Sequence, residues 1–259
     1  MEALGTGRLV VDETAGGNVP ELHVASRVDR PVLMPEGDTL VGGLQNRTLN
    51  VTVLLAAAFD GIIPVSCVEA GRWGSRRAFS HGGSFAPRRV RREKTRSVSD
   101  ASVRFGERRS DQGAVWASID DELDRHGVAS STRAIHDARD RTVHLIEELV
   151  GVGPLPGQHG VVVSLGRAVV AADLFDRPET LAAYWRPIVE SVAFDAGHPY
   201  PGTPSASAVL RFLHRIADGP TVETAGMDMG TEFRVRTQRV EAQGLRLDDS
   251  LVHLSAFAA

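Results

Sequence analysis

Residues 48–55, Thr48-Leu49-Asn50-Val51-Thr52-Val53-Leu54-Leu55, alternate polar and apolar side chains over most of their length. Alternation with a period of two is typical of a β-strand that turns one face toward the core. Similar short runs lie at residues 21–27, 32–34 and 62–68, and turn-forming Gly, Asp and Asn residues separate them. Residues 1–70 are therefore expected to form an antiparallel, β-rich region.

Beyond residue 110 the pattern becomes mixed. Apolar residues recur every three or four positions, as in amphipathic helices, in the windows 111–126, 130–150, 176–192 and 205–216. Residues 161–165 and 168–172 flank Gly166-Arg167 and predict a hairpin. Three or four further strands are expected after residue 221, including 232–240 and 251–256.

Strands followed by mixed helices and strands predict the α+β class, with an α+β part over residues 110–259. No internal repeat or clear linker is visible, so residues 1–259 are expected to form a single domain. A domain of this size needs no covalent staple. The one cysteine, Cys67, excludes a disulfide scaffold and argues against a structural zinc site.

The charge is concentrated in one segment. Residues 71–110 hold twelve basic and three acidic residues, including Lys94, the only lysine; since the whole chain has a net charge of −4, the remainder carries −13. Gly82-Gly83 and Pro87 interrupt the segment. We therefore expect residues 71–109 to be a long basic irregular segment, with one helical turn near residues 88–98. Either a solvated loop or a nucleic-acid-binding surface would explain its charge.

Signals for export and for membrane insertion are absent from the sequence. The first residues lack a basic region followed by an apolar one, and the most apolar stretch, 51–65, is interrupted by Asp60 and too short to span a bilayer. A cytoplasmic location without membrane contact is therefore expected. Common phosphate-loop, dinucleotide and metalloprotease signatures are also missing, and the histidines lack ligand spacing, so no metal or cofactor is predicted.

Two groups of polar residues lie near predicted strand ends. Glu36 with Gln45 and Asn46 offers carboxylate and amide groups that can read hydroxyls, although the same residues are typical of turns. Glu69, Arg72 and Trp73 could orient a ribose, clamp a phosphate and stack on a base. The alternative for this second group is a structural ion pair covered by a tryptophan.

The neighbouring Cys67 shares a predicted strand face with Glu69. The thiol would be a nucleophile if a nearby cation lowered its pKa, and otherwise it belongs to the core. A third polar group, Ser110, Asp111 and Gln112, opens a predicted helix. Backbone amides at such a position bind anions, and the same residues are typical of an N-terminal cap.

Several motifs occur in a fixed order along nearly the whole chain. They are VLMPEG (32–37), QNRTLN (45–50), IPVSCVE (63–69) with GRW (71–73), SDQ (110–112) with VW (115–116), PLPGQ (154–158) with GVVV (160–163), and DLF (173–175). In this order they resemble the bacterial domain family named for its association with ADP-ribosylglycohydrolases and rhodanese-phosphatase proteins. The resemblance implies a ligand derived from ADP-ribose or NAD and carries no catalytic assignment.

We therefore expect a protein that binds, and if it is an enzyme processes, an ADP-ribose- or NAD-derived phosphorylated nucleotide. The expected ligand contacts are Glu36, Gln45 and Asn46 for sugar hydroxyls, Arg72 for phosphates and Trp73 for the base. Ser110 and Gln112 are further expected ligand-binding residues, and Glu69 or Asp111 is the expected general acid or base. Two alternatives stay open. One is a nucleic-acid-binding module that uses residues 76–109, and the other is a non-enzymatic partner of ADP-ribose-handling enzymes.

Overall fold

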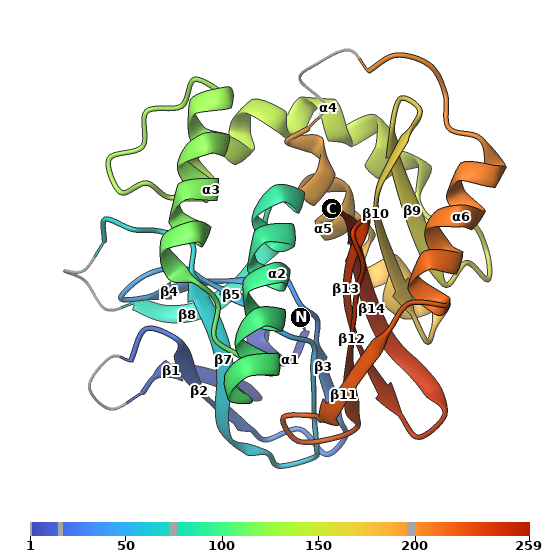
Figure 1. Ribbon diagram of the computed structural model, residues 1–259. Helices are drawn as coiled ribbons and strands as arrows, with labels where there is room; N and C mark the ends of the chain where they lie inside the picture. The colour runs from blue at the N-terminus through green and yellow to red at the C-terminus, as the bar shows by residue number, and fades with distance from the viewer. Residues whose placement is uncertain (1, 15–17, 73–76, 196–199) are drawn as a thin grey trace.

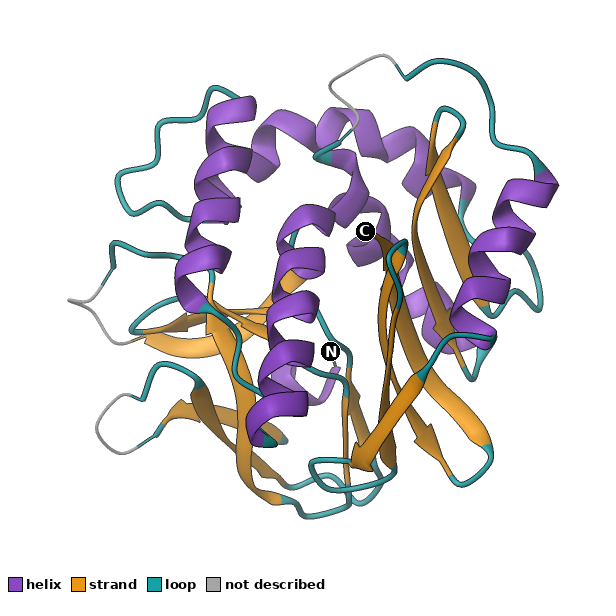
Figure 2. Cartoon of the chain, in the orientation of Figure 1, coloured by secondary structure: helices purple, strands orange, loops and turns teal. Residues whose placement is uncertain are grey.

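The structure is a computed structural model that describes residues 2–14, 18–72, 77–195 and 200–259 (Figure 1). The described residues form an α+β fold with fourteen strands, six α-helices and one 3-10 helix. Figure 2 shows the arrangement of helices, strands and loops. Twelve of the strands belong to two six-stranded antiparallel sheets, one from each half of the chain. The expected α+β class and the β-rich N-terminal part are confirmed.

The N-terminal sheet has the strand order β1-β2-β7-β5-β4-β8. Its strands, in chain order, are β1 (Leu9–Glu13), β2 (Glu21–Ser26), β4 (Asp38–Gly43), β5 (Arg47–Leu49), β7 (Asp60–Cys67) and β8 (Arg77–Phe85), and a short helix, α1 (Glu2–Gly5), precedes them. Leu22 and Val24 of β2 are buried while His23 between them is partly exposed, as the alternation predicts. A separate ladder joins β3 (Val32–Met34) to β6 (Val53–Leu55).

The window 48–55 does not form one strand. The chain leaves β5 after Leu49 and enters β6 at Val53, and Asn50 and Thr52 lie in the connection. Both of these polar side chains are buried, like the apolar Val51 between them. The alternation in this window therefore distinguishes apolar from polar contacts inside the protein. It does not distinguish a buried face from a solvent-exposed face.

The expectation of an irregular segment over residues 71–109 was wrong. Most of the segment forms β8 and an 18-residue helix, α2 (Arg88–Phe105). Gly82 lies within β8, where a side chain would overlap Thr39, and Pro87 precedes the first turn of α2, where its missing N–H is not needed. Apolar periodicity is weak because the buried face of α2 is itself largely polar.

The second half supplies four more α-helices and the other large sheet. The helices are α3 (Gln112–Arg125), α4 (Arg139–Val152), which follows a 3-10 helix (Ile135–Ala138), α5 (Pro178–Ala193) and α6 (Ala206–Ala217). The sheet has the order β11-β12-β13-β14-β10-β9. Its strands are β9 (Gly160–Leu165), β10 (Ala168–Phe175), β11 (Thr221–Ala225), β12 (Thr231–Arg236), β13 (Val240–Leu247) and β14 (Ser250–Ala258). The predicted β9–β10 hairpin is confirmed, whereas the window 232–240 spans the turn between β12 and β13.

Helix α2 lies between the two large sheets, and α6 covers the opposite face of the C-terminal sheet (Figure 1). Strand β13 contacts both helices, through an apolar side chain toward α6 and a polar side chain toward α2. Ala242 belongs to the apolar cluster with Phe212 of α6, whereas Gln243 donates a hydrogen bond to Thr95 of α2. A polar contact thus joins α2 to the C-terminal sheet. No helix in the described part of the chain is long and apolar enough to cross a membrane.

Candidate functional site

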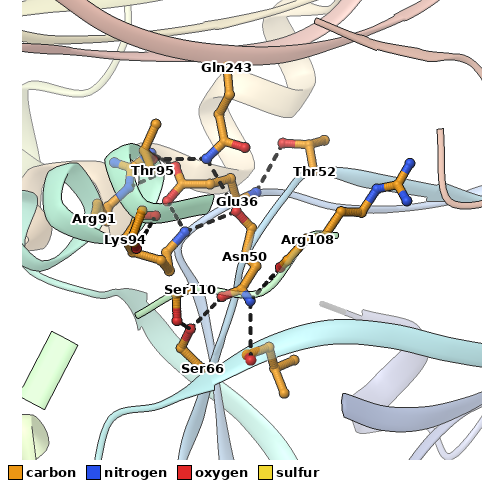
Figure 3. A network of polar contacts seen from close by, with 12 residues as sticks. Glu36, Asn50, Thr52, Ser66, Arg91, Lys94, Thr95, Arg108, Ser110 and Gln243 are labelled. Carbon is orange, nitrogen blue, oxygen red and sulfur yellow. Dashed lines mark hydrogen bonds and ion pairs between the residues drawn. The ribbon is translucent and has the colours of Figure 1, made fainter. Parts of the chain in front are cut away.

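A buried network of charges holds α2 between the sheets (Figure 3). Arg91 Nη2 donates to Glu36 Oε2 at 2.9 Å and to Asp173 Oδ1 on β10 at 2.6 Å. Its guanidinium lies over the rings of Phe85 and Phe257, at 4.7 and 5.0 Å from their centroids. These contacts use the fork geometry and the flat face of arginine together.

Lys94 completes the balance of charge in this network. Its Nζ donates to Glu36 Oε1 at 2.7 Å and to the Asn50 carbonyl oxygen at 3.2 Å, and the side chain is fully buried. Burial alone would raise the pKa values of Glu36 and Asp173, but the cations hold both below their usual range, that of Asp173 at about 2. Two cations therefore neutralise two carboxylates in the core.

Neutral groups extend the network to both sheets. Ser66 donates to Asn50 Oδ1 and also contacts Ser110, while Asn50 Nδ2 donates to the carbonyl of Arg108 at 2.9 Å. Farther along, Thr52 Oγ1 lies 2.7 Å from Nδ1 of His253 on β14. Glu36 and Ser110, both expected to contact a ligand, are thus parts of this internal network.

The structure brings together four other predicted site residues: Gln45, Asn46, Glu69 and Arg72. Glu69 Oε2 accepts from the Asn46 backbone N–H at 3.2 Å and from Arg72 Nε at 3.0 Å. Arg72 also donates to Asn46 Oδ1 and to the carbonyl oxygens of Gly42 and Gly43. The guanidinium of Arg72 is therefore used to hold the loop between β4 and β5. Trp73, expected to stack on a base, lies outside the described residues.

A small cavity lies next to this group, lined in part by Thr39, Asn46, His136 and Glu190. Its volume of about 10 Å³ is space for roughly one water molecule. A nucleotide does not fit into it in this conformation.

The third predicted group, at the start of α3, makes contacts within the protein. Asp111 Oδ1 accepts from the Ala114 backbone N–H at 3.1 Å and so caps the helix. The Gln112 amide bonds the backbone N–H and C=O of Cys67, at 2.8 and 2.9 Å. Burial raises the pKa of the Cys67 thiol to about 11, so the thiol is neutral at physiological pH.

An open cleft lies between α2 and α3, and we call it the α2–α3 cleft. Its volume is about 340 Å³, and its lining residues are Arg89, Arg92, Glu93, Ala114, Ala117, Ser118, Asp121, Glu122 and Arg125. Arg89 Nε donates to Asp195 Oδ1 at 2.8 Å, just beyond α5. Arg92 and Arg125 have no hydrogen-bond or ion-pair partner among the described residues. Burial and the neighbouring Arg88 and Arg89 lower the pKa of Arg92.

Glu122 is the unusual acid of the α2–α3 cleft. Its side chain is 1% exposed, and neither carboxyl oxygen accepts a hydrogen bond from a described residue. The nearest cation is Arg89, whose Nε lies 3.4 Å from Oε1. Burial and the charge of Asp195 raise the pKa of Glu122 to about 7, against the opposing effect of Arg89. Such a carboxyl can exchange a proton near neutral pH, beside arginines suited to phosphate.

The cleft was missed because no short motif marks it. Two of its arginines, Arg89 and Arg92, come from the segment expected to be irregular, where only helical spacing distinguishes cleft-lining arginines from buried ones. Arg88 and Arg91, three positions apart, are buried and paired with carboxylates, whereas Arg89 and Arg92 lie on the face toward α3. A helix predicted over residues 88–105 would have provided that signal.

Comparisons with known proteins give one positive finding. No curated protein and no solved structure matches the chain. A profile of the ARG and Rhodanese-Phosphatase-superfamily-associated Protein domain, ARPP-1, matches residues 1–257. The chain therefore belongs to the ARPP-1 domain family.

Proposed function

We propose that the protein binds an ADP-ribose- or NAD-derived phosphorylated nucleotide, and that the α2–α3 cleft receives its phosphates. The observation that carries this proposal is a cleft of about 340 Å³ in which Arg92 and Arg125 lack carboxylate partners among the described residues. Arginine binds phosphate oxygens through paired N–H donors, and ligand sites of about 300–1,000 Å³ suit molecules of this size.

The proposal moves the phosphate contact away from Arg72, whose donors already hold Glu69 and the β4–β5 loop. The family name adds support by association, since it links the domain to ARG and rhodanese-phosphatase proteins. Reading ARG as ADP-ribosylglycohydrolase, as the motif resemblance implies, belongs to the proposal. Enzymes of these two kinds would share a phosphorylated ligand with this domain.

Calorimetric titration with ADP-ribose, NAD and pyrophosphate tests the proposal. Replacing Arg92 or Arg125 by Met keeps an apolar stem and removes the donors, so we expect affinity to fall about ten- to hundredfold, the usual range for a charged hydrogen bond. Arg104→Met is the matched control, because Arg104 is an exposed arginine in the last turn of α2, the helix that carries Arg92. Absence of binding, or equal losses in all three variants, would show the proposal to be wrong.

A non-enzymatic partner domain is the second candidate, favoured by the association in the family name. It predicts a defined complex with such an enzyme and no heat from any nucleotide. The nucleic-acid alternative has fewer donors than the sequence suggested, because Arg88 and Arg91 are buried in ion pairs. A short RNA in the same titrations tests it, since such binding would weaken steeply with salt.

A further inference from the structure

Glu122 and a bound phosphate would compete for the same cation. Arg89 is the cation nearest to the Glu122 carboxyl, at 3.4 Å, and it is already shared with Asp195 at 2.8 Å. A phosphate that enters the α2–α3 cleft and contacts Arg89 therefore weakens the one close attraction that favours ionised Glu122. It also brings a further negative charge beside a carboxyl that receives no hydrogen bond from the described residues.

We infer that the α2–α3 cleft binds its phosphate-bearing ligand together with one proton, and that Glu122 carries this proton. The inference rests on the proposed function and specifies how the same site is regulated. The overall step is the addition of one ligand and one proton to the protein, and no covalent bond to the ligand forms or breaks. Protonated Glu122 is uncharged and therefore does not repel a phosphate bound to Arg89, as an ionised carboxylate would.

The surroundings of Glu122 supply no other group that would replace the proton. From α2, Arg88 and Arg89 face it, and both are paired with Asp195, the anion that lies beyond α5. From α3 itself, Arg125 adds a weaker attraction, and His126 Nε2 lies 3.9 Å from Oε2. Asp121 also lines the cleft and adds negative charge.

The charge balance sets the expected pH dependence. Because the pKa of Glu122 is about 7 without ligand, an added anion moves it above neutrality. Ligand affinity is then nearly constant below pH 7 and falls as the pH rises, by up to about tenfold per pH unit while the bound form stays protonated. A site built from arginines alone would keep its affinity over this range, because arginines do not titrate there.

Calorimetry of ADP-ribose binding at pH 8, in two buffers of different ionisation enthalpy, measures proton uptake directly. ADP-ribose is suitable because its diphosphate does not titrate near neutral pH. We expect uptake approaching one proton for the wild type and for Asp121→Asn, the matched control in the same cleft. Glu122→Gln should bind without uptake and with little dependence on pH. Should that variant not fold, difference infrared spectra of the wild type should show a carboxylic-acid band on adding ADP-ribose.

The outcomes separate this inference from the proposed function. Binding of ADP-ribose by the wild type without proton uptake, or uptake that persists in Glu122→Gln, overturns the inference and leaves the nucleotide site standing. Absence of binding by the wild type overturns both. Proton uptake that is lost in Asp121→Asn and kept in Glu122→Gln would show that Asp121 carries the proton, and it would overturn the inference.

Discussion

Replacing Lys94 by Met should destabilise the fold far more than a surface substitution on the same helix. Met has a similar length and fills the space, but the change removes the cation 2.7 Å from Glu36. Of the described lysine and arginine side chains, Arg91 alone would then pair with Glu36 and Asp173, so the fully buried site would lack one positive charge. Removing one partner of a buried ion pair costs about 3–5 kcal/mol, a large part of the roughly 5–15 kcal/mol that stabilises a domain.

Urea unfolding followed by circular dichroism measures this loss as a difference in unfolding free energy. Arg96→Met provides the matched control, because Arg96 lies on α2 and pairs with Glu93 at the surface, where such pairs contribute about 0–1 kcal/mol. The double variant Lys94→Met, Glu36→Gln removes the excess charge and should be more stable than Lys94→Met alone. A loss below about 1 kcal/mol, or simple addition in the double variant, would refute the reasoning.

The same network fixes the sign of a pH effect. The pKa of Glu36 is held below its usual value of 4.5, so its ion pairs stabilise the fold above that pH and lose their contribution as the pH falls. The loss of unfolding free energy caused by Lys94→Met should therefore be smallest in acid. A difference in unfolding free energy between the wild type and Lys94→Met that grows in acid would contradict the assigned role of Glu36.

Three further predictions concern single side chains. Cys67, with its pKa raised to about 11, should react with a thiol reagent at pH 8 only on the timescale of unfolding, and rapid labelling of folded protein would contradict its burial. Asp111→Ala removes the cap of α3 and should lower the unfolding free energy by about 1 kcal/mol, whereas an unchanged urea midpoint would mean that the cap is replaced. Because the pKa of Glu122 is raised in the folded protein, its contribution to the unfolding free energy is complete at low pH and declines as the pH rises toward about 7. The unfolding free energy of Glu122→Gln should thus exceed that of the wild type by up to about 3 kcal/mol above pH 7 and equal it near pH 4.5. Equal unfolding free energies at pH 8 would contradict this prediction.

The sequence predicts best the elements whose partners are close along the chain. The β9–β10 hairpin depends on a turn at Gly166, whose φ of 57° suits glycine. The proximity of Asn46, Glu69 and Arg72 follows from the adjacent pairing of β4 with β5 and of β5 with β7. Local spacing was sufficient in these cases, because the contacts form between neighbouring strands.

Elements that depend on distant partners were not predicted. Arg91 meets Glu36 and Asp173, which lie 55 and 82 residues away, so its place on a buried helical face leaves no local pattern. A basic residue in a polar segment suggests solvent, and only the fold reveals the carboxylates that neutralise it. The position of Arg92 in the α2–α3 cleft and the burial of Glu122 were hidden for the same reason.

The placement of α2 has a consequence for how the chain matures during translation. Arg91 emerges from the ribosome long before β10 brings Asp173, one of its two carboxylate partners. Until then the helix has cations without their full set of counter-charges and cannot be buried at low cost. The N-terminal half should therefore await the C-terminal sheet, with α2 held in water or by a chaperone, and the two halves should reach their native state together.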